Sequence, residues 1–289
     1  MSISTNKFLN HIVIALGKIS GGKIQKEAIR ILYWYYRNCP PHSVRESRKY
    51  NELHKEDIKT VESLLCDAES KRIYISMLDF RATYDLRIHP GYTKDANFVK
   101  ELVRCGEDEV FVDCGAYDGD TIKLFLNYVN GKYKRIVAFE PDPTNFAKAS
   151  DYLSTMGGEL KDRIVLIKKG VSDSKKVISF KANGDECSMI TDEENDKVIK
   201  IETIALDELV ECSDATYIKM DIEGEEMNAL KGAQKLIMEK RPKLAISIYH
   251  KDSDMTDIAL FIHELVPEYR MFVRQHSHSY YDTVLYCFV

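Results

Sequence analysis

The sequence predicts an α/β protein with a mostly parallel sheet, an antiparallel C-terminal strand and a helical N-terminal appendage. Three observations carry this prediction. Short apolar runs alternate with helical patterns from residue 109 onward, which is typical of βαβ units and a parallel sheet. The last two apolar runs are joined by a loop too short for a helix. No strand pattern precedes residue 109.

The front of the chain reads as helical. Residues 4–19 and 24–38 carry apolar side chains at helical spacing, and the pattern returns at 55–66, 70–84 and 94–104. Glycines at 21 and 22 and prolines at 40 and 41 interrupt it. We therefore divide the chain into a helical region, residues 1–100, and an α/β domain, residues 101–289.

In the α/β domain, each predicted strand is followed by a predicted helix. The strands are 109–114, 135–140, 164–168, 217–221 and 243–249, and the helices begin near 121 or span about 144–156, 224–239 and 255–266. Two departures stand out. Segments 175–181 and 198–202 predict an inserted hairpin, and segments 270–274 and 283–288 predict a terminal antiparallel pair.

Composition excludes several protein classes. The 289 residues include 44% hydrophobic side chains and carry a formal net charge of −5, so the chain is globular and lacks the overall basic charge of a general nucleic-acid binder. No stretch of about 18 apolar residues could span a membrane. Seven cysteines without a C-x-x-C motif indicate reduced thiols and a cytoplasmic protein. Residues 1–100 hold 17 basic and 11 acidic side chains, so a peripheral contact of this region with an anionic membrane remains open.

The turn after the first strand, residues 113–121, reads DCGAYDGDT. Gly115 and Gly119 would let the backbone and the next helix approach a ligand closely. A carboxylate, Asp113, opens the turn, and the second glycine of the dinucleotide fingerprint is missing. This favours a cationic aminoacyl ligand such as S-adenosylmethionine over NAD. The alternative is a generic glycine turn in which Asp120 caps the helix.

Glu140 ends the second predicted strand. In doubly wound folds a carboxylate at this place accepts hydrogen bonds from ribose hydroxyls. The alternative is a solvated acid at a strand end.

Asp221 and His250 end the fourth and fifth predicted strands, beside the expected ligand cleft. Either could act as a general base toward a hydroxyl, although a hydrogen-bonded structural histidine is an equal alternative. The acids at 221, 223, 225 and 226 could hold a divalent cation, but nothing in the sequence fixes their geometry. His276 and His278 lack a third ligand. We assign no metal ligand.

Together these segments resemble the FkbM family of S-adenosylmethionine-dependent methyltransferases, over about residues 109–289. The sheet pattern is also that of class I methyltransferases, which are Rossmann-like. The matching stretches, in chain order, are 112–121, 139–142, 170–173, 218–225, 230–233, 242–250 and 282–286. In the last stretch Asp282 stands where the family commonly has glutamate.

The resemblance implies specific roles. Residues of the turn would bind the aminoacyl part of the cofactor, Glu140 the ribose, and Val171 with Ser172 would lie near the adenine. Asp221 would lie nearest the methyl group. The turn residues concerned are Asp113, Gly115, Tyr117, Gly119, Asp120 and Thr121.

The family's usual reaction is O-methylation, which predicts an enzyme acting on a hydroxylated acceptor such as a sugar, a glycan or a small metabolite. Two alternatives stay open: a lipid or secondary-metabolite hydroxyl, and a non-catalytic nucleoside-binding scaffold of a glycan-synthesis complex. Residues 1–100 would contact the acceptor or a second subunit of a homo-oligomer. Residues 1–60 match no pattern that we can assign.

Overall fold

The structure is a computed structural model that describes residues 41–289, except for 95, 183–188 and 191–197. The predicted helices at 4–19 and 24–38 lie outside the described residues. Within the described part, none of the helices has the length and apolar character needed to cross a membrane.

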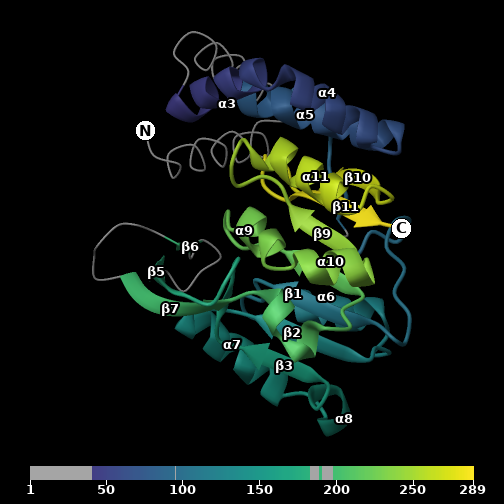
Figure 1. The fold of residues 1–289 in the computed structure, drawn as a ribbon, viewed down its shortest axis with the longest axis vertical. Coiled ribbons are helices and arrows are strands. Elements are labelled where there is room, and N and C mark those ends of the chain that lie inside the picture. The colour runs from purple at the N-terminus through teal and green to yellow at the C-terminus, as the bar shows by residue number, and fades with distance from the viewer. Residues whose placement is uncertain (1–40, 95, 183–188, 191–197) are drawn as a thin grey trace, which may run out of the picture.

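A seven-stranded sheet forms the centre of the molecule, in the order β10-β11-β9-β8-β1-β2-β3 (Figure 1). Strands β3, β2, β1, β8 and β9 pair in parallel with their neighbours in this order, whereas β11 pairs antiparallel with both β9 and β10. The predicted mostly parallel sheet with an antiparallel C-terminal strand is therefore confirmed. The strand bounds are β1 Val110–Cys114, β2 Arg135–Phe139, β3 Ile164–Ile167, β8 Tyr217–Met220, β9 Lys243–Ser247, β10 Arg270–Gln275 and β11 Thr283–Phe288.

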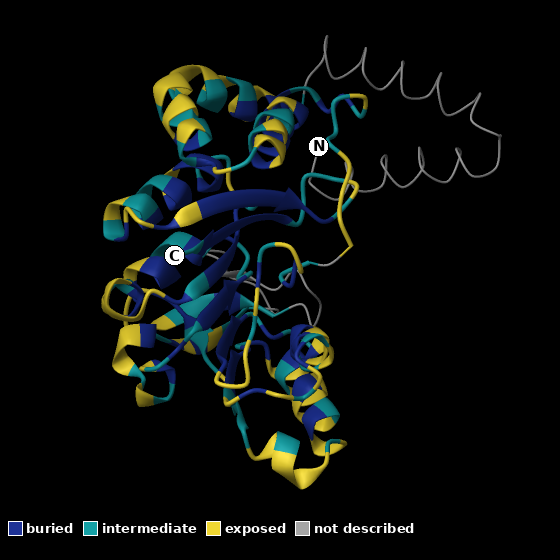
Figure 2. Ribbon diagram, turned by 90° about the vertical axis from the view of Figure 1, so that its right-hand side faces the viewer, coloured by how far each residue is buried: buried dark blue, intermediate teal, exposed yellow. Residues whose placement is uncertain are grey.

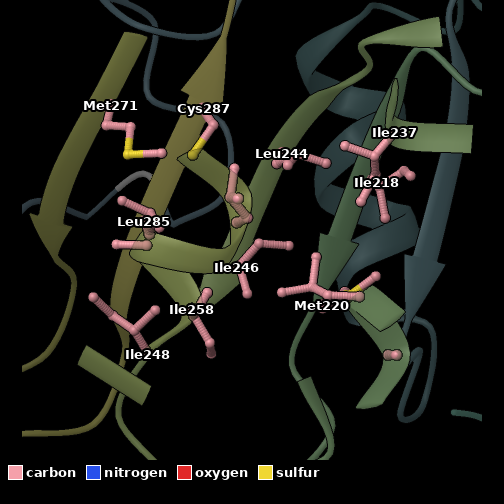
Figure 3. Close-up of a cluster of buried hydrophobic side chains, with 14 of the residues drawn as sticks. Ile218, Met220, Ile237, Leu244, Ile246, Ile248, Ile258, Met271, Leu285 and Cys287 are labelled. Carbon is pink, nitrogen blue, oxygen red and sulfur yellow. The ribbon is translucent and has the colours of Figure 1, made fainter. Parts of the chain in front are cut away.

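Successive strand residues face two separate hydrophobic clusters, because side chains alternate along a strand. On one face, Phe111, Ile136 and Tyr217 pack with residues of α6 and α7. On the other, residues such as Ile218 and Leu244 pack with α9, α10 and α11, as Figure 3 shows for part of this cluster. The helices are α6 Asp120–Tyr128, α7 Pro143–Ser154, α9 Glu226–Lys231, α10 Gln234–Lys240 and α11 Asp254–Leu265, and a short α8 spans Gly158–Lys161. Figure 2 shows the buried strands between helices whose outer sides are exposed.

The predicted insertion between the third and fourth strands of the parallel series is also present. Strands β5 Val177–Lys181 and β7 Val198–Ile204 pair antiparallel, and β7 also pairs in parallel with β4 Gly170–Val171. A two-residue strand, β6 Met189–Ile190, completes this four-stranded sheet. Two 3₁₀ turns, Leu206–Glu208 and Val210–Cys212, then lead back to β8.

Three N-terminal helices lie at the β10 end of the sheet: α3 His42–Leu53, α4 Lys55–Leu64 and α5 Ala68–Thr83 (Figure 1). Helix α5 packs against β10, α3 packs against α5, and α4 packs against α11. Leu65 forms an isolated bridge with Met271 of β10. The Ser70 hydroxyl accepts the backbone N–H of Val273 at 3.0 Å, and Arg274 forms an ion pair of 2.7 Å with Asp67. Apolar residues of α4 and α5 belong to the same cluster as β8 and β9. The helical region thus shares its core with the sheet.

Two local predictions were wrong. The described residues of 94–104 form turns rather than a helix, because Phe98 is buried among aromatic rings and Asn97 takes φ +64°. The N–H of Asn97 donates to the hydroxyl of Tyr286, and its carbonyl accepts from Tyr217, so tertiary contacts replace helical hydrogen bonds. The expected helix 224–239 is two helices, interrupted at Gly232. A Cβ there would lie 2.1 Å from the carbonyl oxygen of Ser172.

Candidate functional site

The predicted site residues gather at one edge of the sheet, where β1, β2, β8 and β9 all end. These strands are parallel and in register, so their carboxyl ends meet. The turn after β1 lies between Glu140, which follows β2, and Asp221, which follows β8. This is the place where doubly wound folds bind ligands.

The turn after β1 has a strained backbone that is stabilised from both sides. Gly115, Tyr117 and Gly119 all have positive φ, and Gly119 caps α6. A Cβ on Gly115 would lie 2.1 Å from the carbonyl oxygen of Asp221, and one on Gly119 would lie 2.8 Å from the ring of Tyr152. Both glycines are therefore required by close approach within the protein itself.

Most backbone donors of this turn already have acceptors. The N–H groups of Gly115 and Ala116 donate to the carbonyl of Phe139, and that of Gly119 donates to Ala116. The N–H of Tyr117 donates to Glu140 Oε2 at 2.9 Å. A turn that has used these donors offers little to a diphosphate, which agrees with the sequence-based preference against NAD.

Beneath the turn lies a buried ion pair. Lys219 Nζ is 3.0 Å from Asp113 Oδ1, and the two side chains are 4% and 0% exposed. Lys219 also donates to the carbonyl of Gly115 at 2.7 Å. Asp113 thus supports the turn from below, through Lys219.

The two members of this pair have different electrostatic surroundings. Burial raises the pKa of Asp113 to about 6, against the attraction of Lys219 and with added repulsion from Asp120 and Asp221. Burial lowers the pKa of Lys219, but attraction to the same three carboxylates outweighs it, and the net shift is upward. The edge therefore holds three carboxylates around one ammonium group, which leaves an excess of negative charge.

Glu140 connects the turn to β2. Its Oε2 accepts from Tyr117, and its Oε1 accepts the N–H of Asp142 at 2.8 Å. The side chain is buried, and burial raises its pKa to about 7, although these two backbone donors lower it. Each carboxylate oxygen that accepts one N–H keeps a lone pair for a further donor.

The remaining predicted cofactor residues differ in accessibility. Asp120 is exposed at the start of α6, where its Oδ1 accepts the N–H of Thr121 at 2.6 Å. Thr121, Val171 and Ser172 are buried, and Val171 belongs to the large hydrophobic cluster. The Ser172 hydroxyl lies 3.4 Å from Asp173 Oδ1.

Asp221 and His250, the two predicted catalytic residues, lie next to each other. His250 Nε2 is 3.5 Å from Asp221 Oδ1 and 3.6 Å from Glu223 Oε2, while its Nδ1 is 3.1 Å from Glu226 Oε1. The Tyr249 hydroxyl donates to Asp221 Oδ1 at 2.9 Å. The side chain of Asp221 is 32% exposed and that of His250 is 8% exposed.

Burial lowers the pKa of His250, but Glu226, Asp221 and Glu223 outweigh it and raise the pKa to about 9. Sequence reasoning did not anticipate that Tyr249 and Glu226 contact this pair. A strand period of two places Tyr249 on the face opposite His250, and the bend after β9 removes that alternation. His276, by contrast, is a structural histidine, with Nε2 2.8 Å from the hydroxyl of Tyr286 and Nδ1 3.0 Å from the carbonyl of Thr93.

The Methyltransferase FkbM domain family matches residues 113–280. Hexuronic acid methyltransferase AglP of Haloferax volcanii is 28% identical over 134 residues, which are 45% of this chain and 52% of that protein. The chain therefore spans about half the length of this curated relative. The crystal structure of Methyltransferase FkbM from Methylobacillus flagellatus KT has 28% sequence identity and a TM-score of 0.72, and the match covers 83% of this chain and 60% of that one.

The family match includes the turn after β1, Glu140, Asp221 and His250, and it spans more than half of the chain. The fold that surrounds these residues is that of a solved member. The chain belongs to the FkbM methyltransferase family.

Proposed function

We propose that this protein is an S-adenosylmethionine-dependent methyltransferase that transfers a methyl group to a hydroxyl of a sugar-type acceptor. The observation that carries the proposal is the meeting of the turn after β1, Glu140, Asp221 and His250 at one sheet edge, with carboxylates in excess over ammonium groups.

The residues at this edge fit the cofactor. S-adenosylmethionine supplies an activated methyl group on a sulfonium, and its aminoacyl part carries an ammonium. Asp113, Asp120 and Asp221 surround the turn with negative charge, which attracts both cations. Glu140 can accept hydrogen bonds from ribose hydroxyls while it holds the N–H of Tyr117. We propose the turn 113–121, Glu140 and the neighbouring segment 171–172 as the cofactor site.

For the transfer itself, the chain must position a hydroxyl and remove its proton. We propose that Asp221 accepts this proton, because its carboxylate is the more exposed of the two catalytic candidates and the Tyr249 hydroxyl fixes one of its oxygens. His250 would orient Asp221 from the buried side. Positioning and proton removal are the contributions that a protein can make when the donor is already activated.

The acceptor class comes from chemistry and from one relative. A hydroxyl needs a base, which the edge supplies, and AglP is named for action on a hexuronic acid. A hexuronic acid carries both hydroxyls and a carboxylate, so the methyl group could form an ether or an ester.

Two experiments test the proposal. Calorimetry with S-adenosylmethionine should give one binding event per chain, and the absence of heat would favour a scaffold without cofactor. A radiolabelled methyl donor should then label hexuronic-acid glycans, sugar nucleotides or lipid-linked glycans. An alkali-stable product supports an ether, whereas an alkali-labile product would refute transfer to a hydroxyl. In the Asp221→Asn variant, we expect turnover to fall by about 10²–10⁴-fold while the cofactor still binds.

A further inference from the structure

Asp221, Glu226 and His250 each offer one donor atom, and these atoms all lie within 4.8 Å of one another. They come from three places in the chain: Asp221 follows β8, Glu226 begins α9, and His250 lies beyond β9. Glu223, at φ +57° in the loop between β8 and α9, adds a carboxylate 3.6 Å from His250 Nε2. One imidazole and several carboxylates therefore converge on a common point.

Two of these side chains are deeply buried, and Glu226 has a carboxylate oxygen without a hydrogen-bond partner among the described residues. Glu226 is 0% exposed and His250 is 8% exposed. Oε2 of Glu226 makes no hydrogen bond with a described residue, and the ring nitrogens of His250 contact carboxylates only as ion pairs. Buried polar groups are nearly always satisfied, so such an atom indicates a missing partner.

The backbone holds these ligands in place. Glu226 Oε1 accepts the N–H of Ile222 at 2.8 Å, which leaves Oε2 available. The Tyr249 hydroxyl fixes one oxygen of Asp221 at 2.9 Å. Outer hydrogen bonds of this kind orient the ligands in metal sites.

Charge also favours a cation here. Asp221, Glu223 and Glu226 lie around His250, and Asp254, which accepts the N–H of Lys251 at 2.7 Å, adds a further buried acid nearby. The Lys251 ammonium donates to the carbonyl of Gly224. Four acids thus lie around His250, with the ammonium of Lys251 beside them and that of Lys219 near Asp221.

We propose that Asp221, Glu226 and His250 bind a divalent cation, with Glu223 beside it. A mixed set of carboxylate oxygens and one imidazole nitrogen suits Mn²⁺ and metals of similar preference. The role of the cation rests on the proposed function: at the sheet edge beside Gly115, it would bind the acceptor hydroxyl and make its proton easier to remove. The proton would still go to Asp221, which would hold the cation with one carboxylate oxygen and accept the proton with the other.

The test uses the full chain, stripped with a chelator and titrated with Mn²⁺ alone. Calorimetry and the loss of the free Mn²⁺ electron paramagnetic resonance signal should both report one ion per chain. Asp221→Asn and His250→Gln should each weaken Mn²⁺ binding at least about tenfold. Glu225→Gln is the matched control. The Glu225 carboxylate accepts a hydrogen bond from Asn228 at 2.8 Å, so this variant should leave Mn²⁺ binding unchanged.

Absence of binding at about 1 mM Mn²⁺ would overturn the proposal and identify the cluster as an ion-pair network. Unchanged affinity in both ligand variants would equally overturn it, because the ion would then sit elsewhere. Thermal unfolding of each variant checks that it folds. Calorimetry with S-adenosylmethionine on the same samples separates the two proposals: a chain that binds the cofactor but no Mn²⁺ refutes only the cation site.

Discussion

Replacement of Lys219 by methionine tests whether the buried ion pair beneath the turn stabilises the fold. The substitution keeps an unbranched side chain of similar length, but it leaves Asp113 wholly buried without its ammonium partner. Breaking a buried pair on one side typically costs about 3–5 kcal/mol. The structure bounds this cost, because Asp113 can take up a proton instead of remaining charged.

The upper limit of this cost is the free energy needed to protonate Asp113. An unfolded aspartate has a pKa of about 3.9, and each pH unit above it costs about 1.36 kcal/mol for a group that must be protonated when folded. At pH 7 the penalty from Asp113 in the variant is therefore at most about 4 kcal/mol, of which wild type, with an Asp113 pKa of about 6, already bears a part, and at pH 5 the penalty falls to about 1.5 kcal/mol. The pKa of Asp113 is higher in the folded protein than in the unfolded chain, so the free energy of unfolding decreases as pH rises.

Urea unfolding of wild type and Lys219→Met at pH 5, 6 and 7 measures this dependence. Lys132→Met is the control, because Lys132 and Glu107 form an exposed, solvent-screened pair whose loss should leave the free energy of unfolding nearly unchanged. The double variant Asp113→Leu/Lys219→Met should be more stable at pH 7 than Lys219→Met, since no buried charge remains. A penalty that does not change with pH, or a double variant no more stable than the single one, would refute the reasoning.

Three further predictions follow from single contacts. Glu140→Gln should weaken S-adenosylmethionine binding about tenfold by calorimetry. The affinity of wild type should fall as pH drops through about 7, where Glu140 gains a proton, and the same pH dependence in the variant would contradict this assignment. Gly119→Ala should destabilise the fold by about 1–2 kcal/mol in a denaturation assay, because Gly119 has a positive φ and lies near the Tyr152 ring. The control Gly157→Ala should be nearly neutral, since Gly157 has open space around it and φ −66°, and equal effects of the two variants would show that the φ argument fails. Ser70→Ala should cost about 1–3 kcal/mol, since it leaves the N–H of Val273 buried and unsatisfied; an unchanged unfolding midpoint would show that α5 does not depend on this bond.

The alternation of strand and helix patterns was sufficient to predict the sheet. The runs that became β1, β2, β8 and β9 are buried on both faces, so they are mostly apolar and easy to recognise. The prediction of a helix at 94–104 was wrong because contacts distant in sequence decide the structure of this segment. Its apolar residues suit a helix, but Phe98 and Asn97 contact Tyr217 and Tyr286, which lie more than a hundred residues away in sequence.

The candidate site, like the fold, was predicted only in part from the sequence. Parallel strands end at one edge, and that rule alone brought Asp113, Glu140, Asp221 and His250 together from the sequence. The pairing of Asp113 with Lys219 depends on the register between β1 and β8, which the sequence does not contain in readable form. The contacts of Glu226 and Tyr249 depend on how α9 begins and how the chain bends after β9.

The sequence by itself determined the order of the elements, the family and the residues at the sheet edge, because periodicity and short motifs are local properties. Only the tertiary structure decided what these residues contact. It made Asp113 a buried support of the turn, gave Gly115 and Gly119 close neighbours within the protein, and surrounded His250 with carboxylates. The physical reason is that burial and charge depend on groups that are distant in sequence, and folding alone brings those groups into contact.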